Sequence, residues 1–186
     1  MKLLKWISTA LMLVTLSSVS GYVMASDTFL EWMISFNHMD GVRPVDNKTY
    51  KAECSSCHIA YQPGLLPAKS WEKLLTPAAL HNHFGEVADL DKETLQTVLN
   101  YAVANSAEKS WFKRARSIAA STSNVDAPLR ITEVRYISRK HHEIPDAMIK
   151  GNKNVRSLSR CDACHTQAEQ GNYDEDTVSI PNYPNY

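Results

Sequence analysis

Four cysteines and the histidines that follow them carry the clearest chemical signal in this sequence. They form two copies of the pattern C-x-x-C-H, one from Cys54 to His58 and one from Cys161 to His165. Two thiols separated by two residues can form thioethers with the two vinyl groups of one haem, and the next histidine can then coordinate the iron. The pattern therefore predicts two covalently bound c-type haems. The predicted attachment residues are Cys54, Cys57, Cys161 and Cys164, and the predicted proximal ligands are His58 and His165.

Other uses of C-x-x-C pairs fit the sequence less well. A thioredoxin-like pair needs a β-α-β context, and apolar β-type runs are scarce here. A structural zinc site would need four ligands to converge from motifs whose first cysteines are 107 residues apart. Disulfides within each pair would leave both following histidines unexplained. Haem attachment is the interpretation that uses all six residues.

The second axial ligand of each iron decides whether the protein carries electrons or acts on a small molecule. Outside the motifs, histidines occur in two clusters, His81 with His83 and His141 with His142. On a helix, residues two apart differ by roughly 200° and adjacent residues by about 100°, so each cluster offers one inward-facing candidate. Sequence proximity favours His83 at the first haem and His141 at the second, but a crossed arrangement also fits.

Two further side chains are weaker candidates for ligands. Met148 lies 13 residues before Cys161 and could reach an iron, although a methionine there more often packs against the porphyrin. His38 has no evident role and is expected to be an ordinary polar residue.

Helical patterns dominate the rest of the chain and predict an all-α fold. Ser70 is a candidate N-cap for a helix containing Trp71, and Asp91 is a candidate N-cap for a helix with apolar residues at helical spacing. Pro145 is expected to end the last predicted helix. Further helices are expected over 107–120 and 132–142, and the C-terminal stretch 172–186 is expected to be irregular.

The N-terminus has the features of a secretory signal peptide. Lys2 and Lys5 precede a short apolar region, and Val23-Met24-Ala25 fits a cleavage site, so we expect residues 1–25 to be removed after Ala25. Export to the periplasm, with no stable membrane span after cleavage, follows from this expectation. An uncleaved anchor over residues 3–24 is the alternative.

The mature chain is expected to hold two haem domains, residues 26–120 and residues 121–186. Removing residues 1–25 takes away two lysines and no acidic residue, which leaves a net charge of −2. This balance offers no basic surface for phosphates and argues against nucleic-acid binding. The second domain is short, so its buried surface is expected to depend on the porphyrin.

Several stretches, spread in order over nearly all of the mature chain, form a recognisable pattern. They are Tyr50-x-x-x-Cys54-x-x-Cys57-His58-x-x-Tyr61-x-Pro63-x-Leu65-Leu66-Pro67, Ser70-Trp71, His83-Phe84-Gly85, Pro128 to Thr132, Lys140-His141, Glu143-Ile144 and Cys161-x-x-Cys164-His165. This pattern resembles the bacterial dihaem cytochrome c family. The resemblance implies bis-histidine coordination of both irons, with His83 and His141 as distal ligands. His142 stands where a basic residue, often arginine, is expected, so the choice between His141 and His142 stays open.

The same resemblance implies a one-electron carrier rather than an enzyme. Its expected partners are a small oxygen-binding monohaem cytochrome and a membrane cytochrome b. The alternative is a small dihaem peroxidase or reductase with one open iron, in which His81 or His142 would serve as an acid–base group.

Overall fold

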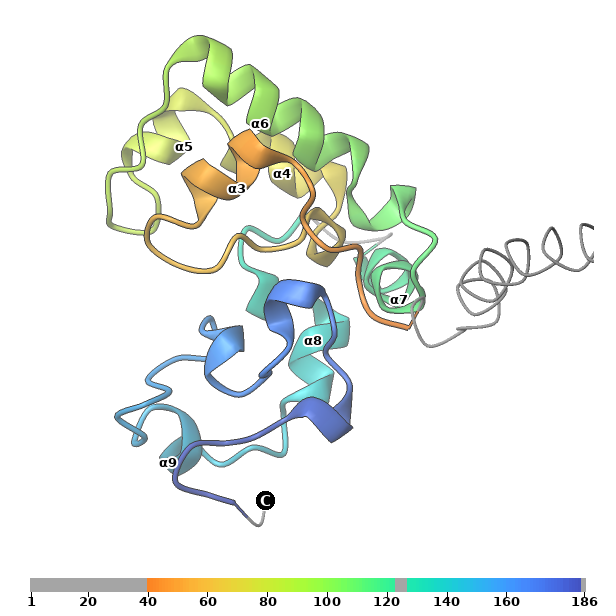
Figure 1. Cartoon of the computed structure of the whole chain (residues 1–186), viewed down its shortest axis with the longest axis vertical. Helices are drawn as coiled ribbons and strands as arrows, with labels where there is room; N and C mark the ends of the chain where they lie inside the picture. The colour runs from red at the N-terminus through yellow and green to blue at the C-terminus, as the bar shows by residue number, and fades with distance from the viewer. Residues whose placement is uncertain (1–39, 123–126, 185–186) are drawn as a thin grey trace, which may run out of the picture. The chain divides into compact units, whose positions relative to one another are not determined.

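The computed structural model describes residues 40–122 and 127–184, which belong to one compact unit (Figure 1). Within these two ranges every regular element is a helix and no strand occurs, so the prediction of an all-α fold is confirmed. No helix in the described ranges is long and apolar enough to cross a bilayer. The expected signal peptide, its cleavage site and His38 lie outside the described residues, and the expected division after residue 120 stays a prediction. The α-helices are α3 (Lys48–Cys54), α4 (Ala68–Leu74), α5 (Pro77–His81), α6 (Lys92–Ala104), α7 (Lys113–Thr122), α8 (Arg135–Lys140) and α9 (Asp146–Ile149).

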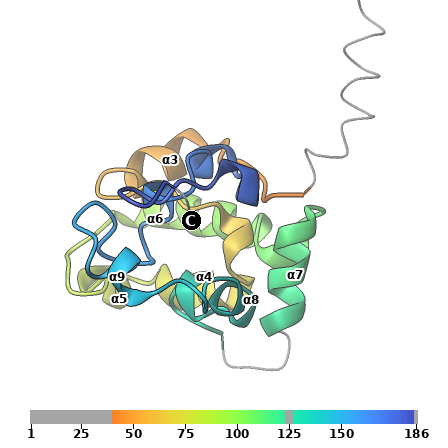
Figure 2. The same cartoon turned by 90° about the horizontal axis from the view of Figure 1, so that it is seen from below.

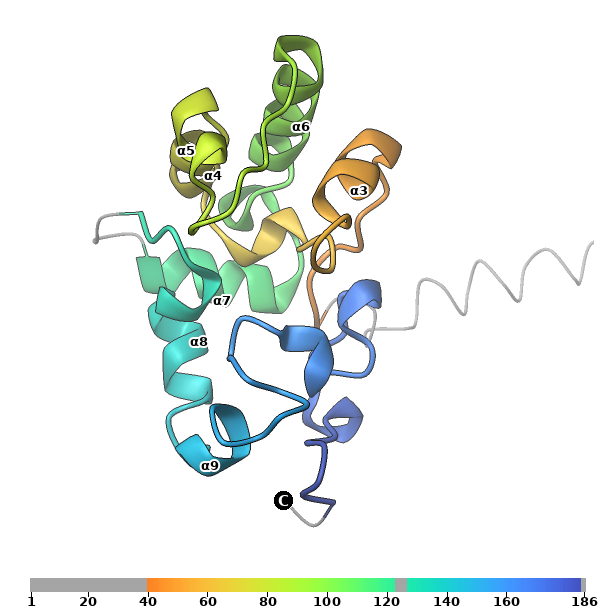
Figure 3. The same ribbon diagram turned by 90° about the vertical axis from the view of Figure 1, so that its left-hand side faces the viewer.

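Helix α6 forms where its N-cap and its apolar stripe predict it. The Asp91 carboxylate accepts hydrogen bonds from the backbone N–H groups of Glu93 and Thr94, both at 3.0 Å. These bonds satisfy donors that have no partner inside the helix, so the predicted N-cap is confirmed. The residues Leu95, Val98 and Ala102 are buried along one side, and α6 packs against α3 and α4 (Figure 3).

Helix α4 begins earlier than predicted. Pro67 is its N-cap, and Ser70, the predicted N-cap, lies inside the helix and is fully buried. The expected cap is wrong because a distant residue does its work: the Glu108 carboxylate accepts the backbone N–H of Ala68 at 2.9 Å. Trp71 is buried one residue later, and its indole N–H donates to the carbonyl of Pro63 at 2.8 Å.

The single helix expected over 107–120 is two elements. A 3₁₀ turn, η3 (Ala107–Lys109), is separated from α7 by residues 110–112, of which Ser110 is extended. The backbone N–H of Ala107, which at the start of a helix has no partner within it, donates to the carbonyl of Leu66 at 2.9 Å.

The helix expected over 132–142 is also shorter than predicted. Residues 131–133 form a 3₁₀ turn, η4 (Ile131–Glu133), and Val134 has an extended ψ before α8 begins. Helices α7 and α8 contact each other on one side of the unit (Figure 2).

A close backbone approach joins the start of the described chain to its C-terminal region. The N–H of Val42 donates to the carbonyl of Gly171 at 2.9 Å. Gly171 has φ +76°. A Cβ at Gly41 would overlap the carbonyl oxygen of Gly171, and a Cβ at Gly171 would overlap the carbonyl oxygen of Val42. The C-terminal stretch is irregular through residue 184, as predicted, apart from the short turn η7 (Glu175–Thr177).

Candidate functional site

The first C-x-x-C-H motif lies at the end of α3. Asn47 caps this helix by accepting the N–H of Tyr50 at 2.8 Å, and the helix ends at Cys54. Cys57 and His58 follow in an exposed turn. The Nδ1 atom of His58 lies 2.6 Å from the carbonyl of Ile59, which in the Nδ1–H tautomer leaves Nε2 free as a ligand.

His83 lies in a tight turn that follows α5. Its N–H and carbonyl pair with Glu86 at 2.7 and 3.2 Å. The two residues between them, Phe84 and Gly85, have φ of +57° and +105°, the signs found in a type I′ turn. A left-handed conformation is unfavourable for a bulky residue such as Phe84, so this turn is held by its surroundings.

The turn brings His83 opposite His58. Their ring centres are 6.4 Å apart and their planes differ by 29°. Roughly 2 Å for each metal–nitrogen bond and roughly 1 Å from each nitrogen to its ring centre gives about 6 Å across one shared metal. The two imidazoles are therefore spaced to bind the two axial positions of a single iron.

A second pair of histidines has the same spacing. His165, directly after the turn η5 (Cys161–Ala163), lies with its ring centre 6.0 Å from that of His141, and their planes differ by 70°. His141 is the C-cap of α8, and its Nδ1 lies 2.8 Å from the carbonyl of Ile137, which orients the ring. In both pairs, one histidine comes from a C-x-x-C-H motif and the other from one of the two predicted clusters.

A large cavity surrounds the second pair. Its volume is about 910 Å³, within the range of pockets that hold cofactors, about 300–1,000 Å³. Cys161, Cys164, His165 and His141 all line it, together with Met148 and other apolar side chains. Thiols and two facing imidazoles in a largely apolar cavity are the donor set that a covalently bound haem requires.

The surroundings of one histidine in each pair favour a neutral imidazole. Burial, followed by the neighbouring His141 and Arg114, lowers the pKa of His165 to about 4. Burial, followed by His58 and Arg130, also lowers the pKa of His83. A neutral ring keeps the nitrogen lone pair available for a metal at neutral pH.

The first thiol of each motif has a raised pKa, the opposite of a redox-active cysteine. Burial raises the pKa of Cys54 to about 12, with a smaller effect from Glu53. Burial raises the pKa of Cys161 to about 11, with Asp162 next in importance. Redox C-x-x-C motifs depend on a lowered thiol pKa, so these environments argue against thioredoxin-like exchange.

The two other candidate histidines are exposed and contact groups outside the facing pairs. His142 is exposed, with Nδ1 2.7 Å from the carbonyl of Arg139 and Nε2 3.6 Å from Glu143. His81 is exposed and its Nδ1 lies 3.1 Å from Asp89. The structure thus places His141 rather than His142 opposite His165, which the sequence could not decide.

Tyr61 and Gln62 connect the region of the first C-x-x-C-H motif to the region of the second. The sequence alone assigned neither residue a functional role. The Tyr61 ring stacks on His58, with centres 4.7 Å apart, and its hydroxyl donates to the carbonyl of Ser159, two residues before Cys161. Gln62 is fully buried and accepts the Tyr173 hydroxyl at 2.7 Å.

Through Tyr173, Gln62 is linked to the histidine of the second motif. Its ring lies edge-on to His165 with centres 5.2 Å apart. The amide of Gln62 also donates to the carbonyl of Ala168 at 2.6 Å. The sequence offers one clue to these contacts, the position of Tyr61 three residues after His58. The hydrogen-bond partners of Tyr61 and Gln62 lie about a hundred positions away and could not be predicted.

Comparisons with known proteins agree with this arrangement. The family model described as dihaem cytochrome c matches residues 50–173. A diheme cytochrome c from Shewanella baltica OS155 is 40% identical, with 73% of this chain and 94% of that chain covered and a TM-score of 0.60. The diheme cytochrome c from Rhodobacter sphaeroides is 42% identical, with 70% and 98% covered and a TM-score of 0.61. A search of curated proteins found no match. The chain therefore belongs to the dihaem cytochrome c family, and it carries two covalently bound c-type haems.

Proposed function

We propose that this protein is an exported one-electron carrier in which both irons have two histidine ligands. Cys54 and Cys57 hold the first haem, with His58 and His83 as its axial ligands. Cys161 and Cys164 hold the second, with His165 and His141. The observation that carries this proposal is the spacing of the two imidazole pairs, 6.4 and 6.0 Å between ring centres.

A bound haem supplies ferric–ferrous chemistry, and the chain decides what else can happen at the iron. With two imidazoles as ligands, neither iron would have a position open to a substrate. The backbone contacts of His58 and His141 hold their rings in place, so ligand geometry need change little between oxidation states. These features support electron transfer rather than catalysis.

The peroxidase or reductase alternative needs an acid–base group over an open iron. The two histidines considered for that role, His81 and His142, are exposed and directed to Asp89 and to the end of α8.

The expected partners follow from the family resemblance. A small oxygen-binding monohaem cytochrome is proposed as the acceptor and a membrane cytochrome b as a further partner, with the donor either a membrane or a soluble protein. Periplasmic location rests on the N-terminal sequence, and purified protein should begin at Ser26.

Carbon monoxide provides the direct test. The dithionite-reduced native protein should show no change in its absorption spectrum under carbon monoxide, because both irons are closed. Peptide mass spectrometry should find a haem mass on both C-x-x-C-H peptides. Stoichiometric carbon monoxide binding at either iron, or a motif without haem, would contradict the proposal.

A further inference from the structure

Two arginines lie close to the haem site of the other half of the chain. Arg114 is in α7, within the part expected to enclose the first haem, yet it lines the cavity of Cys161 and His165. Arg130 lies in the part expected to enclose the second haem, yet its guanidinium lies 4.0 Å from the centre of the Phe84 ring, next to His83. Neither haem attachment nor axial ligation requires an arginine of one half to lie beside the haem site of the other half.

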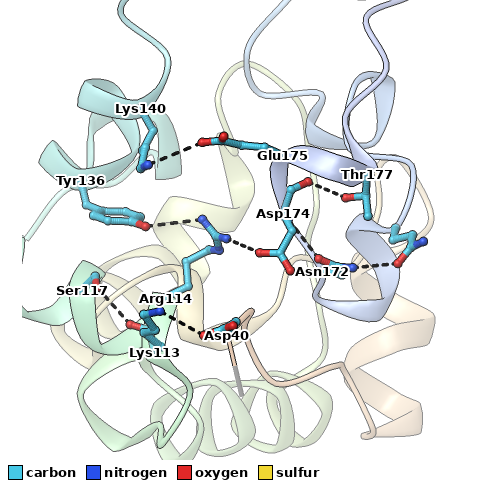
Figure 4. Close-up of polar contacts among 11 residues, drawn as sticks. Asp40, Lys113, Arg114, Ser117, Tyr136, Lys140, Asn172, Asp174, Glu175 and Thr177 are labelled. Atoms are coloured by element: carbon cyan, nitrogen blue, oxygen red, sulfur yellow. Dashed lines mark hydrogen bonds and ion pairs between the residues drawn. The ribbon is translucent and has the colours of Figure 1, made fainter. Parts of the chain in front are cut away.

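Arg114 is held firmly in the cavity wall. Its side chain is only 20% exposed, and Nη2 donates to Asp174 at 2.8 Å, while Nη1 lies 3.4 Å from the Tyr136 hydroxyl (Figure 4). Its Nε is buried and has no acceptor among the described residues. Arginine keeps its charge at all relevant pH values, so a permanent cation stands in the wall of a largely apolar cavity.

Arg130 is placed by an aromatic ring. Its guanidinium stacks on Phe84, whose ring centre is 4.9 Å from that of His83. A cation over an aromatic face is attracted by the ring quadrupole, which fixes where the charge sits. Arg130 is more exposed than Arg114, so water screens its charge more strongly.

A fixed positive charge favours the less positive state of a nearby redox centre. Ferrous haem carries one positive charge fewer than ferric haem, so each arginine should raise the potential of the haem it faces. The effect is stronger in a low-dielectric cavity than in water.

We propose that Arg114 raises the reduction potential of the second haem and Arg130 that of the first, so that each half of the chain sets the potential of the other half's haem. The proposal rests on the two bis-histidine sites proposed above. The arginines bind neither iron; they act through the field at the axial histidines.

The test is a redox titration of the intact dihaem protein, followed by electron paramagnetic resonance. The two ferric signals should be separable because the ring planes differ by 29° at one site and 70° at the other. In Arg114→Gln, the ferrous-to-ferric ratio of the second haem at a fixed potential should fall about tenfold, which is about 59 mV for one electron. In Arg130→Gln, the first haem should shift in the same direction by a smaller amount.

Matched controls separate this effect from a general loss of charge. Arg116→Gln removes an exposed charge from α7, and Arg135→Gln removes one from α8. Neither control should move either potential by a comparable amount. In Arg114→Lys, which keeps the positive charge, the potential of the second haem should stay close to the wild-type value. A shift at the wrong haem, equal shifts at both, no shift, or an equal shift in the controls would overturn the proposal.

Asp174→Asn distinguishes the field from a purely structural contact. Removing this carboxylate leaves the charge of Arg114 uncompensated, so the potential of the second haem should rise. If Arg114 were only a strut to Asp174, Arg114→Gln and Asp174→Asn would break the same contact and shift the potential in the same direction. The Asp174 result stands even if Arg114→Gln fails to fold. Wild-type spectra without two bis-histidine signals would instead refute the proposed function.

Discussion

The imidazole rings of His58 and His83 are close to parallel, with an angle of 29° between their planes. The rings of His141 and His165 are closer to perpendicular, at 70°. Each imidazole donates π density perpendicular to its own plane. Parallel rings therefore raise the same iron d orbital, whereas perpendicular rings raise two different orbitals equally. The two irons should differ in the splitting of these orbitals.

This difference predicts two distinct low-spin ferric signals of equal intensity. The first haem should give a rhombic spectrum, and the second a highly anisotropic one with a larger maximum g value. Low-temperature electron paramagnetic resonance of the oxidised protein measures both at once. One signal accounting for both irons would contradict the ring geometry.

Alanine substitutions at His141 and His142 show which of the two is the ligand of the second iron. In His141→Ala, the second iron should lose one axial ligand, and the reduced protein should bind about one carbon monoxide per chain. His142→Ala should bind none, because His142 is exposed and faces the carbonyl of Arg139. Absorption spectra under carbon monoxide give the stoichiometry. Binding by the His142 variant instead would assign the ligand to the other residue.

The contact between Gly41 and Gly171 should tolerate no side chain. A Cβ at Gly41 would overlap the carbonyl oxygen of Gly171, and a Cβ at Gly171 would overlap that of Val42. Each alanine variant should lose about 2–4 kcal/mol of unfolding free energy, measured by urea titration.

Gly85→Ala is the matched control. Gly85 also has a positive φ, +105°, but nothing lies within 4 Å of its would-be Cβ. It should lose only the cost of backbone strain, about 1 kcal/mol. Equal losses at all three glycines would show that close approach contributes nothing.

Gln62 and Tyr173 form a buried hydrogen-bonded pair whose energies should be coupled. Gln62→Leu leaves the buried Tyr173 hydroxyl without its acceptor and should cost about 1–3 kcal/mol. Tyr173→Phe should cost less, about 1 kcal/mol, because it leaves only Oε1 of Gln62 unpaired, while Nε2 of Gln62 keeps its bond to the carbonyl of Ala168.

A double-mutant cycle measures this coupling. The double variant should lose less than the sum of the two single losses, since the second change removes the group that the first left unpaired. Urea titrations of the four proteins provide the values. Additive losses would mean that the pair contributes no interaction of its own.

The parts of this protein that could be predicted from sequence depend on neighbours in the chain. Two thiols and a histidine within five residues define a haem attachment motif without any fold. The cap of α6 was also predictable, because Asp91 bonds to residues two and three positions away. Local spacing is enough in both cases, since the chain itself holds the groups together.

Only the tertiary structure decided which distant residues meet. Local sequence favours Ser70 as an N-cap, but α4 begins before it, and the carboxylate of the distant Glu108 accepts the first backbone N–H of that helix. His141 and His142 differ by about one step of helix rotation, so only the packed position of α8 places one of them opposite His165. The links from Tyr61 and Gln62 to the second motif likewise have no local signal, because packing of the folded chain brings their partners within reach.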